Sequence, residues 1–438
     1  MTAEGAARHA WLPDLLGSSA MAASYALATI GALFGSHVLV SVMGQPGYSA
    51  VVVGLCVVGV AILVARRHEL TLVRLVPSTL VLLMAWLLLT TAWATSPSLS
   101  IAGWLALAAT ALLATVVAHT RDTMQTVRAT GDVLRVMLTG SLLVEVLSGI
   151  LIDLPISFLS VAGNLADGGP IQGLFGTRTR LGLVTMLAMI TFLVEWRTRS
   201  VRPGLTVYSV VVAAILALFT GSPIVLLLAV ATGLATAVLA IVRRAPAHTR
   251  STLQMALAAI LAIAAVLVYV FRRPLVYWLN AAPEFLTRSQ VWNASLDMVE
   301  RRPVQGWGWY GTWPDNLLPF IHINVLTGRD DTSALNAFID MLLQGGWVGG
   351  FLFAVLCVVA AARAWLTASQ RRSTVYTWPA LILIALLANS FFESTLLCGF
   401  GWFLLVVCAT RSSLVRGWRA GLDDPGGSSP ALPHEPGR

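Results

Sequence analysis

This 438-residue chain has few charged residues and no lysine. Only 11% of its residues are charged, against about 25% in an ordinary soluble domain, and all 28 basic residues are arginine. The four cysteines all fall inside apolar runs, where we expect small buried thiols and no disulfide framework: Cys56, Cys357, Cys398 and Cys408. These absences exclude both a soluble enzyme of ordinary composition and a secreted domain built on disulfides.

What the chain has in abundance is apolar sequence, since 57% of its residues are hydrophobic. Runs long enough to cross a bilayer as helix recur along it. They predict an all-α polytopic membrane protein with about twelve transmembrane helices: 20–42, 47–65, 72–93, 100–118, 133–152, 181–196, 205–221, 223–242, 253–271, 337–362, 377–392 and 397–411. The last two runs are short and could form one re-entrant unit. We expect no cleaved signal peptide, because no small-residue cleavage site follows a short apolar core.

Arginine placement predicts the orientation of these helices. Arginine clusters fall in alternate connections, whereas the short connections near 43–47, 94–99 and 221–223 have none. By the positive-inside rule, both termini are cytoplasmic and the protein lies in the cytoplasmic (inner) membrane. The predicted layout is a cytoplasmic N-terminus at 1–19, nine spans at 20–271, an extracytoplasmic loop at 272–336, three spans at 337–411 and a disordered cytoplasmic tail at 412–438. The net charge of +8 is then an orientation signal, and we expect no nucleic-acid partner.

The loop 272–336 is a polar island in this apolar chain. It contains five of the fifteen tryptophans and six of the 28 arginines. A long polar excursion between spans is where chemistry on water-soluble groups can take place. We therefore expect the function to lie in this loop and in the helix ends that face it.

Within the loop, the segment TRSQVWNASLDMVERRP predicts a helix. Thr287 and Gln290 have capping-box spacing, so the helix should begin at Thr287 and end before Pro303. This places Arg288 in the first turn, with Trp292 one turn further along the same face. Exposed amides and a guanidinium at a helix start would bind a diphosphate. A solvated surface arginine is the alternative.

The next segment, RRPVQGWGWYGTWP, interleaves glycines with aromatic residues. Trp307 and Trp309 could stack on sugar rings, or lie at the membrane interface, which we favour for most of these tryptophans. The chain then re-enters the membrane with Asn336, Asp340 and Gln344 on one polar stripe, at i, i+4 and i+8. Asp340 is a candidate general base, or alternatively a hydrogen-bonding partner for a neighbouring helix.

Three other features carry polar or charged groups. Arg178 and Arg180 follow glycine-permitted turns at a helix start and form a second candidate anion site. Glu145 and Glu393 lie at membrane depth and need partners, and structural ion pairs are at least as expected there as catalysis. The adjacent pair Asp330–Asp331 lacks further ligand spacing and fits helix capping better than a metal, so we predict no metal and no cofactor.

Taken together, these residues resemble the O-antigen ligase and polymerase superfamily, which includes bacterial exopolysaccharide polymerases. The resemblance spans nearly the whole chain and is most specific in 287–350. There it comprises Arg288-x-x-x-Trp292, Pro303-Val-Gln-Gly306-Trp-Gly308, Ala334-Leu335-Asn336 and Gly346-Trp-Val-Gly349. Other similar stretches are Gly173-Leu-Phe-Gly176-Thr-Arg178-Thr-Arg-Leu-Gly182, Trp93-Ala-Thr-Ser96-Pro-Ser-Leu and Asn389-Ser-Phe-Phe-Glu393.

The sequence departs from the family pattern at three positions. The family's His before Asn is Leu335 here, its Ser-Arg after the seventh span is Ser222-Pro223, and its Asn after the basic residue is Thr179. The first two positions belong to the family's catalytic centre, so the resemblance implies a shared fold more strongly than a shared activity. His322, thirteen residues upstream of Leu335, is a candidate substitute, with a solvated loop histidine as the alternative.

The resemblance implies a GT-C-like membrane glycosyltransferase, inverting and metal-independent, that acts as a polysaccharide polymerase or ligase. Its implied donor is an oligosaccharide on a polyprenyl diphosphate, its acceptor is a glycan or lipid, and other polysaccharide-export proteins are candidate partners. The arginines would stabilise the leaving diphosphate, and Asp340 or His322 would deprotonate the acceptor. The predicted catalytic residues are Arg288, Asp340 and His322, and the predicted substrate contacts are Arg178, Arg180, Trp292, Trp307, Trp309 and Asn336.

Two other classes of protein stay open. A non-catalytic or transport protein for lipid-linked oligosaccharide would keep the family fold without the catalytic His and Arg, and Leu335 and Pro223 support that reading. An ion or solute transporter is disfavoured, because no pair of Gly/Pro-broken spans recurs in matching halves.

Overall fold

The computed structural model describes residues 16–68, 75–166, 168–271 and 283–415. Helices dominate these segments, and the predicted all-α class is confirmed. Six helices are long and apolar enough to cross a membrane: Ser36–Ala65 (α3), Pro97–Thr120 (α5), Thr123–Ile152 (α6, Thr123–Val146, with its π-helical extension), Arg178–Thr198 (α7), Pro223–Arg244 (α9) and Ala337–Gln370 (α14). The chain is thus a multi-pass membrane protein, whereas the number of twelve spans stays a prediction.

Shorter apolar helices complete the bundle. They are α2 (Ser19–Phe34), α4 (Ser78–Thr90), α8 (Pro203–Phe219), α15 (Thr377–Ser390) and α16 (Gly399–Val415). Helix α10 (Ala247–Val270) runs beside α9.

The predicted break at 43–47 is a kink inside α3, where Gly44 has φ +72°. Because glycine reaches this left-handed region without a Cβ clash, one residue bends the helix where a loop was expected.

Helix α6 begins at Thr123, ten residues before the predicted span at 133–152. A capping box fixes this start, since the Gln125 amide donates to Asp122 Oδ1 at 2.7 Å and the Asp122 amide donates to Gln125 Oε1 at 3.1 Å. Local capping chemistry therefore extends the helix beyond its apolar run.

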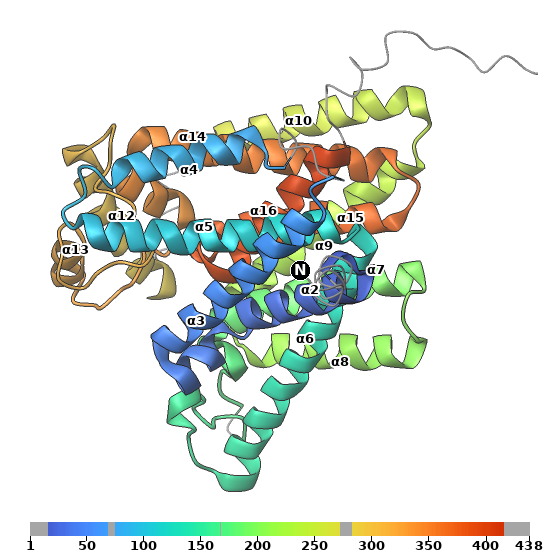
Figure 1. Ribbon diagram of the computed structural model, residues 1–438, viewed down its shortest axis with the longest axis horizontal. Helices are drawn as coiled ribbons and strands as arrows, with labels where there is room; N and C mark the ends of the chain where they lie inside the picture. Colours follow the sequence, from blue (N-terminus) through green and yellow to red (C-terminus); the bar gives the residue numbers. More distant parts are fainter. Residues whose placement is uncertain (1–15, 69–74, 167, 272–282, 416–438) are drawn as a thin grey trace, which may run out of the picture.

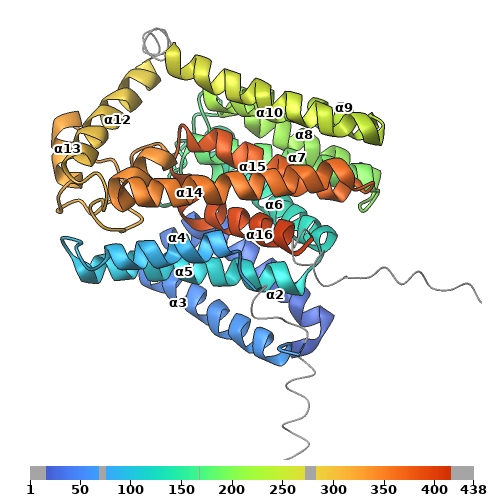
Figure 2. The same cartoon turned by 90° about the horizontal axis from the view of Figure 1, so that it is seen from above.

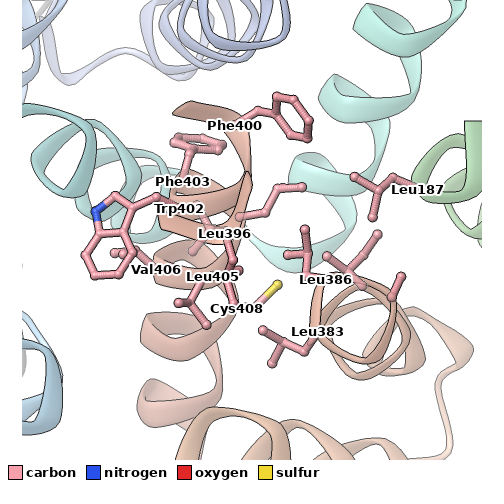
Figure 3. Close-up of a cluster of buried hydrophobic side chains, with 14 of the residues drawn as sticks. Leu187, Leu383, Leu386, Leu396, Phe400, Trp402, Phe403, Leu405, Val406 and Cys408 are labelled. Carbon is pink, nitrogen blue, oxygen red and sulfur yellow. The ribbon is translucent and has the colours of Figure 1, made fainter. Parts of the chain in front are cut away.

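The core of the molecule lies around α16, which packs on α5, α14 and α15 (Figures 1 and 2). Figure 3 shows how side chains of α16 and α15 meet Leu187 of α7 in a continuous apolar cluster. In a bilayer such packing replaces lipid contacts and does not remove apolar surface from water, so shape complementarity holds these helices together.

The loop forms a small folded unit at one end of α4, α5 and α14 (Figures 1 and 2). Its helices are α12 (Pro283–Arg301) and α13 (Phe320–Thr327). The prediction that a helix begins at Thr287 is wrong, because α12 is already helical from Pro283, and proline fits a first helical turn well. Arg288 therefore lies in the second turn, away from the exposed amides of a helix start. The part of the predicted loop at 272–282 lies outside the described residues.

Candidate functional site

The loop is fastened to a bend in α14. Gly346 has φ +66°, which interrupts the helix and frees carbonyl groups of the preceding turn. Three backbone hydrogen bonds then join the segment 303–308 to the bend: Trp307 N to Leu343 O (3.0 Å), Gly308 N to Gln344 O (2.9 Å) and Trp347 N to Pro303 O (2.8 Å). The two glycine motifs seen in the sequence are thus the two halves of one backbone junction.

We expect Gly346→Ala to destabilise the protein by about 3 kcal/mol. A Cβ at Gly346 would collide with the Val304 carbonyl, the positive φ costs about 1–2 kcal/mol for alanine, and each lost hydrogen bond costs about 1 kcal/mol. Thermal unfolding in detergent measures the effect. Gly345→Ala is the matched control, because its Cβ would meet side chains only, the nearest being Leu87 Cδ2 at an ordinary 3.4 Å. Equal stability of the two variants would contradict the junction.

The aromatic residues of the loop point inward. Trp309 is 0% exposed and Trp307 is 9% exposed, and Arg302 stacks on the Trp307 ring at 4.4 Å. The backbone of Trp309 is also held by α4 and α5, through Thr90 Oγ1 (3.1 Å) and Ser100 Oγ (2.7 Å). Trp307 packs in the interior of the loop unit and Trp309 in the core of the helix bundle. Their role as substrate contacts stays a prediction.

Asp340 fastens this aromatic unit to α14. The carboxylate is 1% exposed, and its Oδ1 accepts hydrogen bonds from Trp313 Nε1 (2.8 Å) and Gln344 Nε2 (2.9 Å). Gln344 Oε1 in turn accepts from the amides of Tyr310 (2.7 Å) and Gly311 (3.0 Å). The predicted polar stripe exists and faces the loop. The partners of Asp340 lie in the loop and on its own helix, where the alternative was a neighbouring helix. The role of Asp340 as a general base stays a prediction.

Arg288 is anchored, which excludes the alternative of a solvated surface arginine. Its side chain is 11% exposed and forms an ion pair with Glu393 Oε1 at 3.0 Å, while Nη1 donates to the Phe392 carbonyl. The expected partner of Glu393 is thus Arg288, more than a hundred residues away in sequence. A guanidinium has five N–H donors, so an anionic ligand could still share it. Trp292, on the same helix, has a buried indole N–H without a partner.

Asn336 ties the start of α14 to the same turn. Its Oδ1 caps the helix by accepting from the amides of Phe338 (3.0 Å) and Ile339 (3.2 Å). Its Nδ2 donates to the Phe391 carbonyl at 3.1 Å. The connection between α15 and α16 is therefore held by Arg288 from α12 and by Asn336 from α14. A substrate contact by Asn336 stays a prediction.

The start of α7 reaches this site from the other side. Cys398, at the beginning of α16, lies within electrostatic range of Arg180, Asp340 and Glu393. One residue of the second predicted anion site, Arg180, and the ion-pair partner of Arg288, Glu393, thus both act on the same thiol. The expectation that all four cysteines are buried is wrong for Cys398, which is exposed.

A buried glutamate shapes the turn before α7. Glu145 is 1% exposed, and its Oε1 accepts hydrogen bonds from the amides of Gln172 (2.9 Å) and Gly173 (2.7 Å). Thr177 then caps α7, accepting from the Arg180 amide at 3.3 Å. Glu145 therefore accepts hydrogen bonds from backbone amides, whereas the sequence suggested an ion pair. These bonds fix the turn that precedes Arg180.

Two of the positions that depart from the family pattern, Leu335 and Ser222-Pro223, have unusual local structure. Leu335 has φ +50°, a conformation that costs an L-residue about 1–2 kcal/mol. Pro223 is the first residue of α9 and the neighbouring Ser222 hydroxyl is buried without a partner. His322 is half-buried on α13, and among the contacts of the described residues none joins it to Arg288. Its role stays a prediction.

Comparison with known families agrees with this architecture. Residues 170–354 match the model of the family described as O-antigen ligase. This region of the chain is similar to the O-antigen ligase family. The resemblance predicted from the sequence is thereby confirmed. The matched region runs from the turn before α7 into α14, and so contains Arg178, Arg180, Arg288, Asn336 and Asp340. No curated protein matches the chain.

The matched region also takes part in a buried ion pair that sequence reasoning missed. Arg135 of α6 pairs with Glu195 of α7, which is 0% exposed. The Arg135 guanidinium also donates to Asp132 Oδ1 at 2.7 Å and to Ser209 Oγ at 3.0 Å. It lies over the Phe192 ring, 5.0 Å from the ring centroid. An arginine and a glutamate inside two apolar runs were the available signal.

Proposed function

We propose that the chain is a membrane glycosyltransferase of polysaccharide assembly, a polymerase or ligase. It transfers a glycan from a polyprenyl diphosphate to a sugar hydroxyl at the outer face of the cytoplasmic membrane. The observation that carries the proposal is the ion pair at 3.0 Å between Glu393 and Arg288, which lies inside the region that matches the O-antigen ligase family. Arg180 and Glu393 both lie within electrostatic range of Cys398, which supports a place for Arg180 in the same site. A diphosphate is the doubly charged group that two guanidinium side chains recognise best.

The proposed reaction is a single displacement without a metal. The acceptor oxygen attacks the anomeric carbon, its proton passes to Asp340 or His322, and the bond between that carbon and the diphosphate oxygen breaks with inversion. Arg288 and Arg180, with Arg178 beside it, stabilise the negative charge on the departing diphosphate. Because Asp340 is enclosed by Trp313 and Gln344, any effect of replacing it includes loss of loop position.

The arginines of the opposite end support the proposed orientation. Arg243 donates to the carbonyls of Ala368 (2.7 Å) and Arg372 (2.6 Å), and Arg411 donates to the Ala118 carbonyl at 3.2 Å. These residues lie at the far end of α14 from the loop unit. A basic end opposite the site is what an outward-facing active site predicts.

A second candidate is a non-catalytic protein that binds or moves lipid-linked oligosaccharide. Leu335 favours it, because leucine cannot transfer a proton where the family has histidine. The strained φ of +50° is kept nonetheless, so the backbone around this position retains a shape that ordinarily accompanies function.

The glycan profile of a deletion strain separates the two candidates. For a polymerase we expect the ladder of surface polymer to collapse to single repeat units, and for a ligase we expect finished polymer to stay on its lipid. Complementation with the wild-type gene should restore the profile, and a Leu335→His variant tests whether histidine raises the activity. An unchanged profile on deletion would favour the non-catalytic protein.

A further inference from the structure

A long groove opens on the surface of the bundle along α7 and α9, with the end of α8 at one end and the start of α15 at the other. Helices α8 and α9 both pack on α7 and scarcely touch each other, which leaves a volume of about 1300 Å³ above α7. Its lining runs from Gly221 at one end to Arg244 at the other. The 22 residues of α9 rise about 33 Å, so the groove follows the full hydrocarbon thickness of about 30 Å.

The walls of this groove are apolar in effect. Most lining side chains are aliphatic or small, among them Leu226, Ala229 and Gly233. The hydroxyls of Thr232 and Thr236 donate to carbonyls of their own helix, at 2.7 Å each, so neither proton is available to a ligand. The unpartnered hydroxyl of Ser222 lies at the end far from the arginines. A space of this length and character fits hydrocarbon chains, and it exceeds the roughly 1,000 Å³ upper range of small-molecule pockets.

One end of the groove is basic. Arg197, Arg243 and Arg244 line it, and in the described part of the chain no carboxylate does. Arg243 is occupied by backbone carbonyls of the α14–α15 connection. The other two side chains are exposed, and Trp196, 54% exposed, lies beside them as a residue suited to the headgroup level. Fixed positive charge next to apolar walls is complementary to an anionic lipid.

We propose that this groove binds an anionic phospholipid, with its acyl chains along α7 and α9 and its phosphate at Arg197 and Arg244. The phosphate site lies at the end of the bundle opposite the loop unit and does not depend on the proposed transferase function. The lipid fills a gap that protein packing leaves open beside α9.

The test uses the purified full-length protein, exposed to equimolar dioleoyl phosphatidylglycerol and dioleoyl phosphatidylcholine and then washed in detergent. Mass spectrometry of the retained lipid gives the ratio of the two. We expect the wild type to retain phosphatidylglycerol preferentially, and Arg197→Gln and Arg244→Gln each to lower this preference about fivefold. Arg202→Gln is the control, because it removes the same charge at the same end outside the groove lining.

A second pair of variants tests the chain-binding part. An added Cβ at Gly233 meets nothing within 4 Å, so Gly233→Leu should fill the groove without disturbing the fold and reduce retained lipid of both kinds. Gly54→Leu, at an equally open position of α3, should retain the wild-type amount.

Three results would overturn the proposal. Retention of both lipids in the supplied ratio would mean unselective annular lipid only. An equal effect of Arg202→Gln would mean general surface charge. Displacement of phosphatidylglycerol by a long-chain isoprenyl phosphate, with binding independent of Arg197 and Arg244, would assign the groove to a carrier tail.

Discussion

Replacement of Arg288 by alanine is expected to lower glycan transfer by about 10²–10³-fold, the usual effect of removing one donor that stabilises developing charge. The guanidinium is held between Glu393 and the Phe392 carbonyl, so it is positioned before the donor arrives. Electrostatic stabilisation of this kind acts without reorganisation at the moment of reaction. Polymer or ligated product in a complemented deletion strain measures the loss.

Donor binding to the same variant can be followed through Cys398, the exposed thiol beside the site. We expect lipid-linked donor to slow alkylation of this thiol by a maleimide in the wild type and to have little effect in Arg288→Ala. Arg301→Ala, at an exposed position at the end of the same helix, is the matched control. Arg288→Lys keeps the charge and loses the planar fork, so an intermediate rate is expected. Wild-type transfer by Arg288→Ala would remove Arg288 from the mechanism.

Replacement of Arg135 by methionine is expected to destabilise the fold by about 3–5 kcal/mol, the usual cost of removing one partner from a buried ion pair. Glu195, 0% exposed, would then hold an uncompensated charge between α6 and α7. Asp132, a nearby carboxylate of the same sign, adds to the imbalance. Unfolding in detergent, followed by helical circular dichroism, measures the difference.

The double variant Arg135→Met/Glu195→Leu should regain most of the lost stability, because apolar side chains of similar volume often replace a buried pair at little cost. Arg202→Met, exposed at the start of α8, controls for the loss of one positive charge and should change stability little. If the single and double variants were equally unstable, the two residues would not act as a pair.

The sequence by itself determined the class of the protein and its family. Apolar runs of membrane length force helices, because every backbone polar group in hydrocarbon must be paired within its own segment. The motifs around Arg288, Gly306 and Gly346 were sufficient to indicate the O-antigen ligase family that the match at 170–354 bears out. Helix starts were less certain: the capping pattern at Thr287 failed, and the one at Asp122 was overlooked.

Only the tertiary structure decided which residues meet. Nothing in the spacing of Arg288 pointed to Glu393 as its partner, or brought Arg180 of α7 to the same place. Composition suggested that Trp309 would face sugar or lipid, yet it is enclosed because the bend at Gly346 draws the loop onto α14. Periodicity and capping act over one or two turns of chain, whereas these contacts join residues far apart in sequence and are set by how the helices pack.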